Sequence, residues 1–225
     1  MQGAFDALTV TIKLYPAIVT LHLLGGYLGL VLLTAQLQAG AAQRVALPSG
    51  LRRAAWGLTG LVVLQSALGG WVSTNYAVLA CSSFPACQGS WWPAMNFADG
   101  FTIWRDLGHR SDGSLLPFEA LTAIHYTHRL AAYAVLAAMV GLAVVLLRRR
   151  DAALRPFGLA LAGLAAWQLA TGLSNVVLDW PIAAAIAHTG GAGATLVVLT
   201  ALLVRARRRS VFVAELRPGA RPAPA

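Results

Sequence analysis

The chain has 225 residues, of which 58% are apolar and only 11% are charged. A soluble globular domain carries about 25% charged residues, so this composition excludes an ordinary soluble protein and a disordered chain, and two cysteines are too few for a disulfide scaffold. The formal net charge of +9 would suit a nucleic-acid partner, but the positions of the basic residues argue against one. We therefore expect an integral membrane protein surrounded by lipid.

Five apolar stretches are long enough to cross a bilayer, which takes about 20 residues of helix. They predict an all-α, polytopic membrane bundle with spans near residues 14–37, 54–78, 117–147, 156–178 and 181–204. Before them, residues 2–12 form a mostly apolar stretch of about half a span. The chain is therefore expected to begin within a helix.

The basic residues fall mainly on one side of this predicted bundle. Thirteen of the 17 Lys and Arg residues lie in two connections and the tail: Arg44, Arg52, Arg53, Arg148, Arg149, Arg150, Arg155, Arg205, Arg207, Arg208, Arg209, Arg217 and Arg221. Positive charge in short loops marks the cytoplasmic side. The pattern predicts a bacterial-type inner membrane protein with a cytoplasmic C-terminus and an outer loop at residues 79–116.

A repeat links the two ends of the chain. Gln2 leads through a proline to His22, and Gln168 leads through a proline to His188, with 20 residues from Gln to His in both copies and a Gly pair close behind. Repeats of this kind indicate related structural units. We expect two similar four-helix halves of an eight-helix fold, of which this chain holds one complete half. The predicted division is 1–43 for the end of the first half, 44–204 for the second half and 205–225 for an Arg/Pro-rich tail.

Three histidines lie inside predicted spans, which is costly unless they face the bundle interior. At 1.5 Å per residue, His22, His128 and His188 lie about 9, 16 and 10 Å from the outer ends of their helices. Two histidines at similar depth on facing helices favour bis-imidazole haem ligation. Zinc is a weaker alternative, because no carboxylate or thiolate lies at that depth.

Two neighbours of His128 are candidates for supporting roles. Arg129 either pairs with backbone carbonyls or holds a haem propionate, and the propionate role is the one we favour. His125 shares a helix face with His128, which suggests a second-shell position or one on a substrate path. His109 is expected to be a solvated loop residue.

The outer loop contains both cysteines, Cys81 and Cys87, six residues apart. Outside the cytoplasm thiols oxidise, so the pair is expected to close a small disulfide loop. This disulfide either staples the loop or exchanges with a thiol–disulfide partner, and the staple is the safer interpretation. The aromatic residues that follow indicate an interfacial belt or a lid over a haem edge: Trp91, Trp92, Phe97, Phe101 and Trp104.

The residues from Gln65 to Cys81, then Phe84-Pro-Ala-Cys87, and then Ala123-Ile-His-Tyr-Thr-His128-Arg129 resemble the haem A synthase family. The resemblance runs from Gln2 to about Val204, with the first three helices of the family lacking. It implies an eight-helix fold of two pseudo-symmetric halves in which His128 and His188 ligate haem b. It also implies that the cysteines are the family's outer-loop pair.

The same resemblance implies an activity. Family members oxidise a methyl group of haem O to a formyl group, giving haem A for cytochrome oxidase assembly, with electrons from a donor that the sequence does not identify. His22 then corresponds to one ligand of the substrate haem. Its partner ligand and the family's catalytic carboxylate are expected before residue 1, so we expect no conversion of haem O by this chain alone.

Two other classes of protein remain possible from the sequence alone. One is a non-catalytic b-type electron carrier, which would have no need of the cysteine pair and its Trp-rich flank. The other is an inactive fragment or assembly factor, against which the presence of His128, Arg129 and His188 argues.

Overall fold

The computed structural model describes residues 15–41 and 44–206, and within these ranges it contains helices and no β-strand. The five long helices are α2 (Pro16–Ala39), α3 (Ser49–Thr74), α5 (Phe118–Arg148), α6 (Arg155–Val177) and α7 (Ile182–Arg205). Each is long and apolar enough to span a membrane. The predicted all-α polytopic bundle is confirmed. The loop between α3 and α5 holds two short helices, η1 (Ala77–Leu79) and α4 (Phe97–Gly100).

The predicted ends of four long helices agree with the structure within two residues. Proline marks several starts, because its missing N–H costs nothing in the first turn. The prediction for α3 was wrong: the helix begins at Ser49 and ends at Thr74, rather than spanning 54–78. Arg52 and Arg53 therefore lie in its first two turns and not in a connection. A helix can continue beyond the apolar part of a span. A prediction based on the length of the uncharged stretch does not include that extension.

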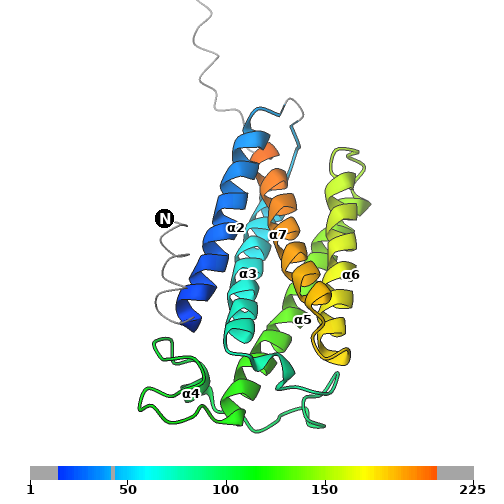
Figure 1. Ribbon diagram of the computed structural model, residues 1–225. Helices are drawn as coiled ribbons and strands as arrows, with labels where there is room; N and C mark the ends of the chain where they lie inside the picture. The colour runs from blue at the N-terminus through cyan, green and yellow to red at the C-terminus, as the bar shows by residue number, and fades with distance from the viewer. Residues whose placement is uncertain (1–14, 42–43, 207–225) are drawn as a thin grey trace, which may run out of the picture.

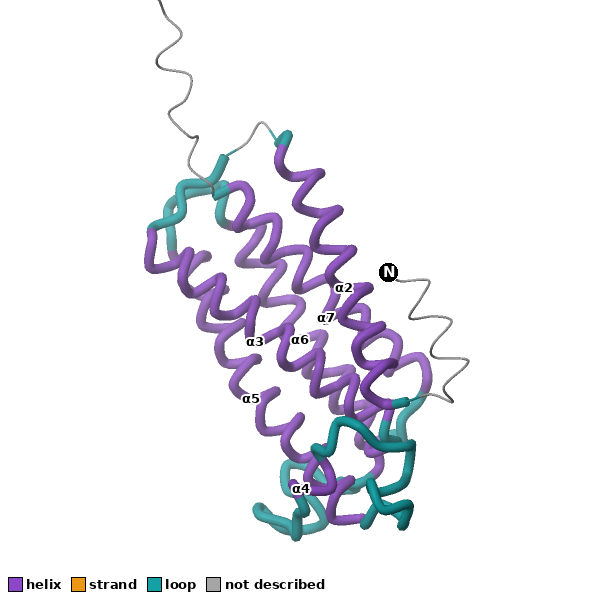
Figure 2. Tube along the Cα trace, turned by 90° about the vertical axis from the view of Figure 1, so that its left-hand side faces the viewer, coloured by secondary structure: helices purple, strands orange, loops and turns teal. Residues whose placement is uncertain are grey.

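The five helices run alongside one another in a single bundle (Figure 1). Helix α2 packs on α3 and α7, α3 also packs on α5 and α7, and α6 packs between α5 and α7. The loop with η1 and α4 gathers at one end of the bundle, and the connections that follow α2 and α5 lie at the other end (Figure 2). The basic connections thus lie at the opposite end from the cysteines.

The main apolar core lies toward the basic end. It is formed where the first halves of α3 and α6 meet the second halves of α5 and α7, with Leu58, Met139, Leu161 and Leu199 among its buried residues. Many large apolar side chains point outward instead, including Leu28, Leu32, Leu33, Trp56 and Leu64. Such exposure is expected where lipid is the solvent. The core leaves the other half of the bundle available for a cavity.

Three sequence predictions concern residues outside the described ranges. They are the partial helix before residue 14, the first repeat copy starting at Gln2, and the tail beyond Ala206. The division at residue 43 stays a prediction. In the structure α2 packs directly on α3 and α7, the first and last helices of the predicted second half.

Candidate functional site

A cavity of about 670 Å³ lies between the five long helices. Pockets for small molecules and cofactors have volumes of about 300–1,000 Å³. Four of the five histidines line it: His22 from α2, His125 and His128 from α5, and His188 from α7. The three histidines predicted inside the spans, together with His125, therefore meet around one cavity.

His128 is held against helix α3 by two residues. The amide Nε2 of Gln65 lies 3.0 Å from Nδ1 of His128 and donates to the backbone carbonyl of the same histidine, also at 3.0 Å. One turn further along α3, a Cβ built on Gly69 would lie 3.0 Å from Cε1 of the imidazole. Any larger residue at this place would push against the ring, which would have to shift by a few tenths of an ångström.

His188 has matching neighbours on helix α6. Its Nδ1 lies 2.9 Å from Oγ1 of Thr171. A Cβ on Gly172 would lie 3.1 Å from Cε1 of the ring. Each predicted ligand therefore packs over a glycine of the neighbouring helix and has a polar group at Nδ1.

His125 connects the cavity with the outer loop. Its Nδ1 donates to the carbonyl of Ala77 in η1 at 2.9 Å, because a carbonyl can only accept. Its Nε2 lies 3.5 Å from Nη2 of Arg129. Both ring nitrogens face partners on the loop side, which agrees with a supporting place rather than a ligand. That role itself stays a prediction.

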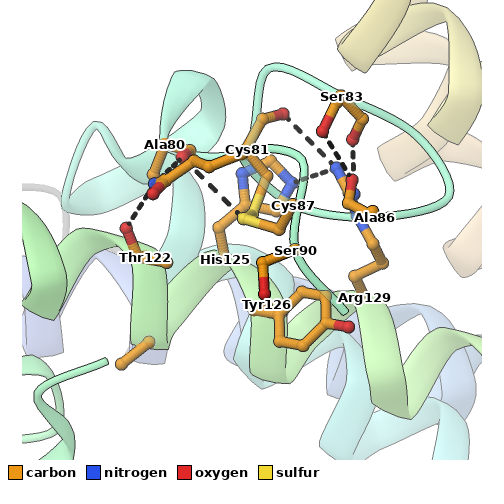
Figure 3. Close-up of a disulfide and its surroundings, with 12 residues drawn as sticks. Ala80, Cys81, Ser83, Ala86, Cys87, Ser90, Thr122, His125, Tyr126 and Arg129 are labelled. Atoms are coloured by element: carbon orange, nitrogen blue, oxygen red, sulfur yellow. Dashed lines mark hydrogen bonds between the residues drawn. A yellow bond between two sulfur atoms is a disulfide. The ribbon is translucent and has the colours of Figure 1, made fainter. Parts of the chain in front are cut away.

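Arg129 is buried beneath residues 81–92, which we call the cysteine loop. It does not line the cavity. Its Nη1 donates to the carbonyls of Ser83 and Ala86 at 2.7 and 3.0 Å, and Nη2 lies 3.4 Å from the carbonyl of Cys81 (Figure 3). This arrangement matches the backbone-carbonyl role, the less favoured of the two alternatives from sequence. Binding of a propionate by Arg129 stays a prediction.

Cys81 and Cys87 form a disulfide, as predicted. They are only 1% and 0% exposed and pack against Tyr126 of α5. Other α5 contacts hold the same segment: Tyr126 donates to the carbonyl of Trp91 at 2.6 Å, and Thr122 accepts from Gln88 at 2.9 Å. Together with Arg129, these side chains occupy one face of α5 at helical spacing. The cysteine loop is thus fastened to the helix that carries His128.

A second buried arginine fastens the rest of the outer loop. Arg105 is 2% exposed, donates to Oδ1 of Asn75 at the end of α3, and lies over the ring of Trp71 with 5.9 Å to its centroid. Burial lowers the pKa of the Arg105 guanidinium, an effect that Asp99 partly opposes. Nearby, Arg110 forms an ion pair with Asp99 at 2.8 Å.

The aromatic residues of the outer loop lie away from the cavity. Trp91, Trp92 and Trp104 are each about two-thirds exposed, and they do not contribute to its lining. Their exposure agrees with an interfacial belt. The tryptophan that does line the cavity is Trp180, between α6 and α7, which the sequence analysis did not single out.

Other polar residues at the cavity were also missed. Gln65, Gln168 and Asn175 line it, and each has a buried side-chain oxygen with no hydrogen-bond partner in the part of the chain that the structure describes. A sequence signal existed for two of them. The pattern Gln-x-x-x-Gly occurs at residues 65–69 and again at 168–172, each time opposite a histidine.

These features fit a flat macrocycle with an iron centre. The cavity wall is mainly apolar, and glycines let the histidine rings pack closely on the neighbouring helices. The amide oxygens without a partner can accept hydrogen bonds from a bound group. Across residues 15–41 and 44–206, no group of three or more His, Cys, Asp or Glu is placed to hold one metal ion. Axial ligation of a haem by His128 and His188 stays a prediction.

Fold and site together define a multi-pass membrane helical bundle with a histidine-lined cavity. Residues 1–202 match the family of cytochrome oxidase assembly proteins designated COX15-CtaA. The chain belongs to this family, and the resemblance to haem A synthases found in the sequence is confirmed.

Two curated relatives illustrate the match. The chain is 36% identical to the haem A synthase of Shewanella oneidensis over 205 residues, which are 89% of this chain and 62% of that protein. It is 32% identical to the haem A synthase of Caulobacter vibrioides over 159 residues, or 68% of this chain and 42% of that protein. The chain thus spans less than two thirds of the length of these relatives.

Proposed function

We propose that this chain takes part in haem A formation, the oxidation of a methyl group of haem O to a formyl group, for cytochrome oxidase assembly. The observation that carries the proposal is the convergence of His22, His128 and His188 on one cavity, in a chain whose relatives are haem A synthases. A bound haem supplies one-electron redox chemistry. The chain supplies ligands, orientation and a water-poor site.

Within this proposal His128 and His188 are the axial ligands of haem b, and residues 44–204 form the haem-binding half. The ligand assignment is supported by the similar surroundings of His128 and His188. Each ring packs over a glycine and has a polar group near Nδ1. His22 faces the same cavity from α2 and is proposed as a ligand of the haem O substrate.

The proposal also includes an orientation in the membrane. The basic end faces the cytoplasm, and the cysteine loop faces the outside. The support is the separation of the basic connections and the disulfide to opposite ends of the bundle together with the positive-inside rule. A membrane-impermeant label tests it: a cysteine introduced at exposed Ser82 should react in intact cells, and one introduced at exposed Arg148 should react only after lysis. The reverse labelling would refute the orientation.

Haem ligation is tested by adding ferric haem b to the purified chain. We expect a six-coordinate, low-spin spectrum that is lost in both His128→Ala and His188→Ala. His109→Ala is the matched control, because that histidine lies in the outer loop and does not line the cavity. An unchanged spectrum in both cavity variants would refute the ligand assignment.

The reaction is tested in the cells that make this protein. A chromosomal His188→Ala substitution should lower the haem A content of the membrane and raise the haem O content, measured by chromatography of extracted haems. His109→Ala should leave the ratio unchanged. A wild-type ratio in the His188 variant would contradict the proposed function.

A further inference from the structure

The hydrogen bonds around Thr171 determine which ring nitrogen of His188 carries its proton. Oγ1 of Thr171 lies 2.7 Å from the carbonyl oxygen of Trp167, one turn earlier on α6, and 2.9 Å from Nδ1 of His188. A carbonyl only accepts, so it takes the single hydroxyl proton. Toward His188 the hydroxyl is therefore the acceptor, and Nδ1 must be the donor.

A neutral imidazole with its proton on Nδ1 has its lone pair on Nε2. Histidines that bind metals usually donate their other ring N–H to a fixed acceptor, which orients the ring and increases the basicity of the ligand. Thr171 is buried, which limits competition from water at its hydroxyl. The adjacent Gly172 lets the ring pack closely on α6.

His128 provides a contrast within the same cavity. The Gln65 amide nitrogen donates to the His128 carbonyl and also faces Nδ1. These contacts do not assign the proton of His128 to one ring nitrogen, because the same amide lies 3.0 Å from Nδ1 and 3.5 Å from Nε2.

We propose that Thr171 is a positioning residue, which fixes the tautomer of His188 and presents its Nε2 to a haem iron. This inference rests on the proposed ligand role of His188. Thr171 does not touch the iron itself; it acts through the Nδ1–H bond. Because that bond makes the imidazole a stronger donor, it stabilises the ferric state more than the ferrous state.

The experiment compares Thr171→Val with wild type, using ferric haem b as the probe in detergent-solubilised full chain. Valine keeps the shape and removes the acceptor. We expect haem to bind 10–100-fold more weakly and the midpoint potential to rise. A tenfold loss confined to the ferric state corresponds to about 59 mV.

Two further variants separate positioning from general stability. Thr171→Ser retains the hydroxyl and should restore wild-type affinity and potential. Thr34→Val is the matched control: Thr34 is also buried and bonds the carbonyl one turn earlier, at 2.8 Å, but it lies away from the cavity. If Thr171→Val does not fold, Thr171→Ala removes the same acceptor with less bulk, and the same shifts are expected.

The outcomes distinguish this inference from the proposed function. If His188→Ala loses the low-spin spectrum while Thr171→Val keeps wild-type affinity and potential, the positioning role is overturned and the ligand role stands. If His188→Ala keeps the spectrum, the ligand role fails and the positioning role fails with it.

Discussion

His128 on α5 packs directly over Gly69 on α3, so closely that a Cβ on the glycine would lie 3.0 Å from the imidazole Cε1. The relationship recurs between His188 on α7 and Gly172 on α6 at 3.1 Å. In both pairs a glutamine precedes the glycine by one helical turn. The α3–α5 and α6–α7 pairs are therefore built alike around their histidines.

Alanine at either glycine should disturb the histidine that it faces. Contacts of 3.0–3.1 Å are shorter than an ordinary Cβ contact, so the ring must move by a few tenths of an ångström. For Gly69→Ala and Gly172→Ala we expect haem affinity to fall about tenfold or more, as for other changes beside a metal ligand. Titration with haem b measures it.

Two other glycines of the same helices provide controls. A Cβ on Gly60 of α3 or Gly163 of α6 would meet nothing within 4 Å. Alanine there should leave haem binding unchanged. It should stabilise the helix by about 1 kcal/mol, because alanine has a higher helix propensity than glycine. Equal losses of affinity in all four variants would show that the close approach has no special role.

Arg129→Lys tests whether this arginine fastens the cysteine loop. A lysine cannot reach the carbonyls of Ser83, Ala86 and Cys81 together, so buried acceptors would lose a charged donor, at a cost of about 1.5–3 kcal/mol. We expect faster hydrogen exchange in residues 81–92 and a lower Tm. Arg148→Lys, at an exposed position on the same helix, should change neither.

The same variant separates the two roles considered for Arg129. Loss of haem affinity with unchanged exchange in the loop would favour the propionate role. Faster exchange in the loop with haem affinity within twofold of wild type would favour the carbonyl role.

The disulfide should resist reduction while the protein is folded. Cys81 and Cys87 are almost fully covered, and a water-soluble thiol must reach a sulfur atom to attack it. We expect no alkylation after treatment with dithiothreitol in mild detergent, and complete alkylation once the chain is unfolded, both measured by mass. Rapid reduction of the folded protein would instead favour exchange with a thiol partner.

Sequence patterns predicted the helices well because apolar length is a strong signal in a membrane protein. The start of α3 was missed because Arg52 and Arg53 are charged yet helical. The histidines were found because an ionisable residue within a span is unusual. Nothing comparable marks Thr171, since a threonine in an apolar helix most often bonds only its own backbone.

The place of Arg129 could not be predicted for a different reason. Its partners are carbonyls of a loop more than 40 residues earlier in the chain, and every residue has a carbonyl. Only the folded path of the loop brings these three together. The repeated Gln-x-x-x-Gly pattern, in contrast, was visible in the sequence and could have indicated both glutamines.

Arg105→Lys should destabilise the outer loop more than the same substitution at Arg110 of the neighbouring ion pair. Burial lowers the pKa of Arg105, so its charge by itself costs stability at neutral pH, and its contacts must offset that cost. Lysine cannot bond Asn75 and lie over Trp71 in the same way. Leaving the buried Asn75 oxygen without its donor costs about 1–3 kcal/mol.

The control is Arg110→Lys. Arg110 and Asp99 are partly exposed, at 37% and 25%, and exposed ion pairs contribute at most about 1 kcal/mol. We expect Arg105→Lys to lower the Tm by several degrees and to increase proteolysis between residues 101 and 116, and Arg110→Lys to change both only slightly. The opposite order would mean that the ion pair, rather than the buried arginine, holds this loop on the end of α3.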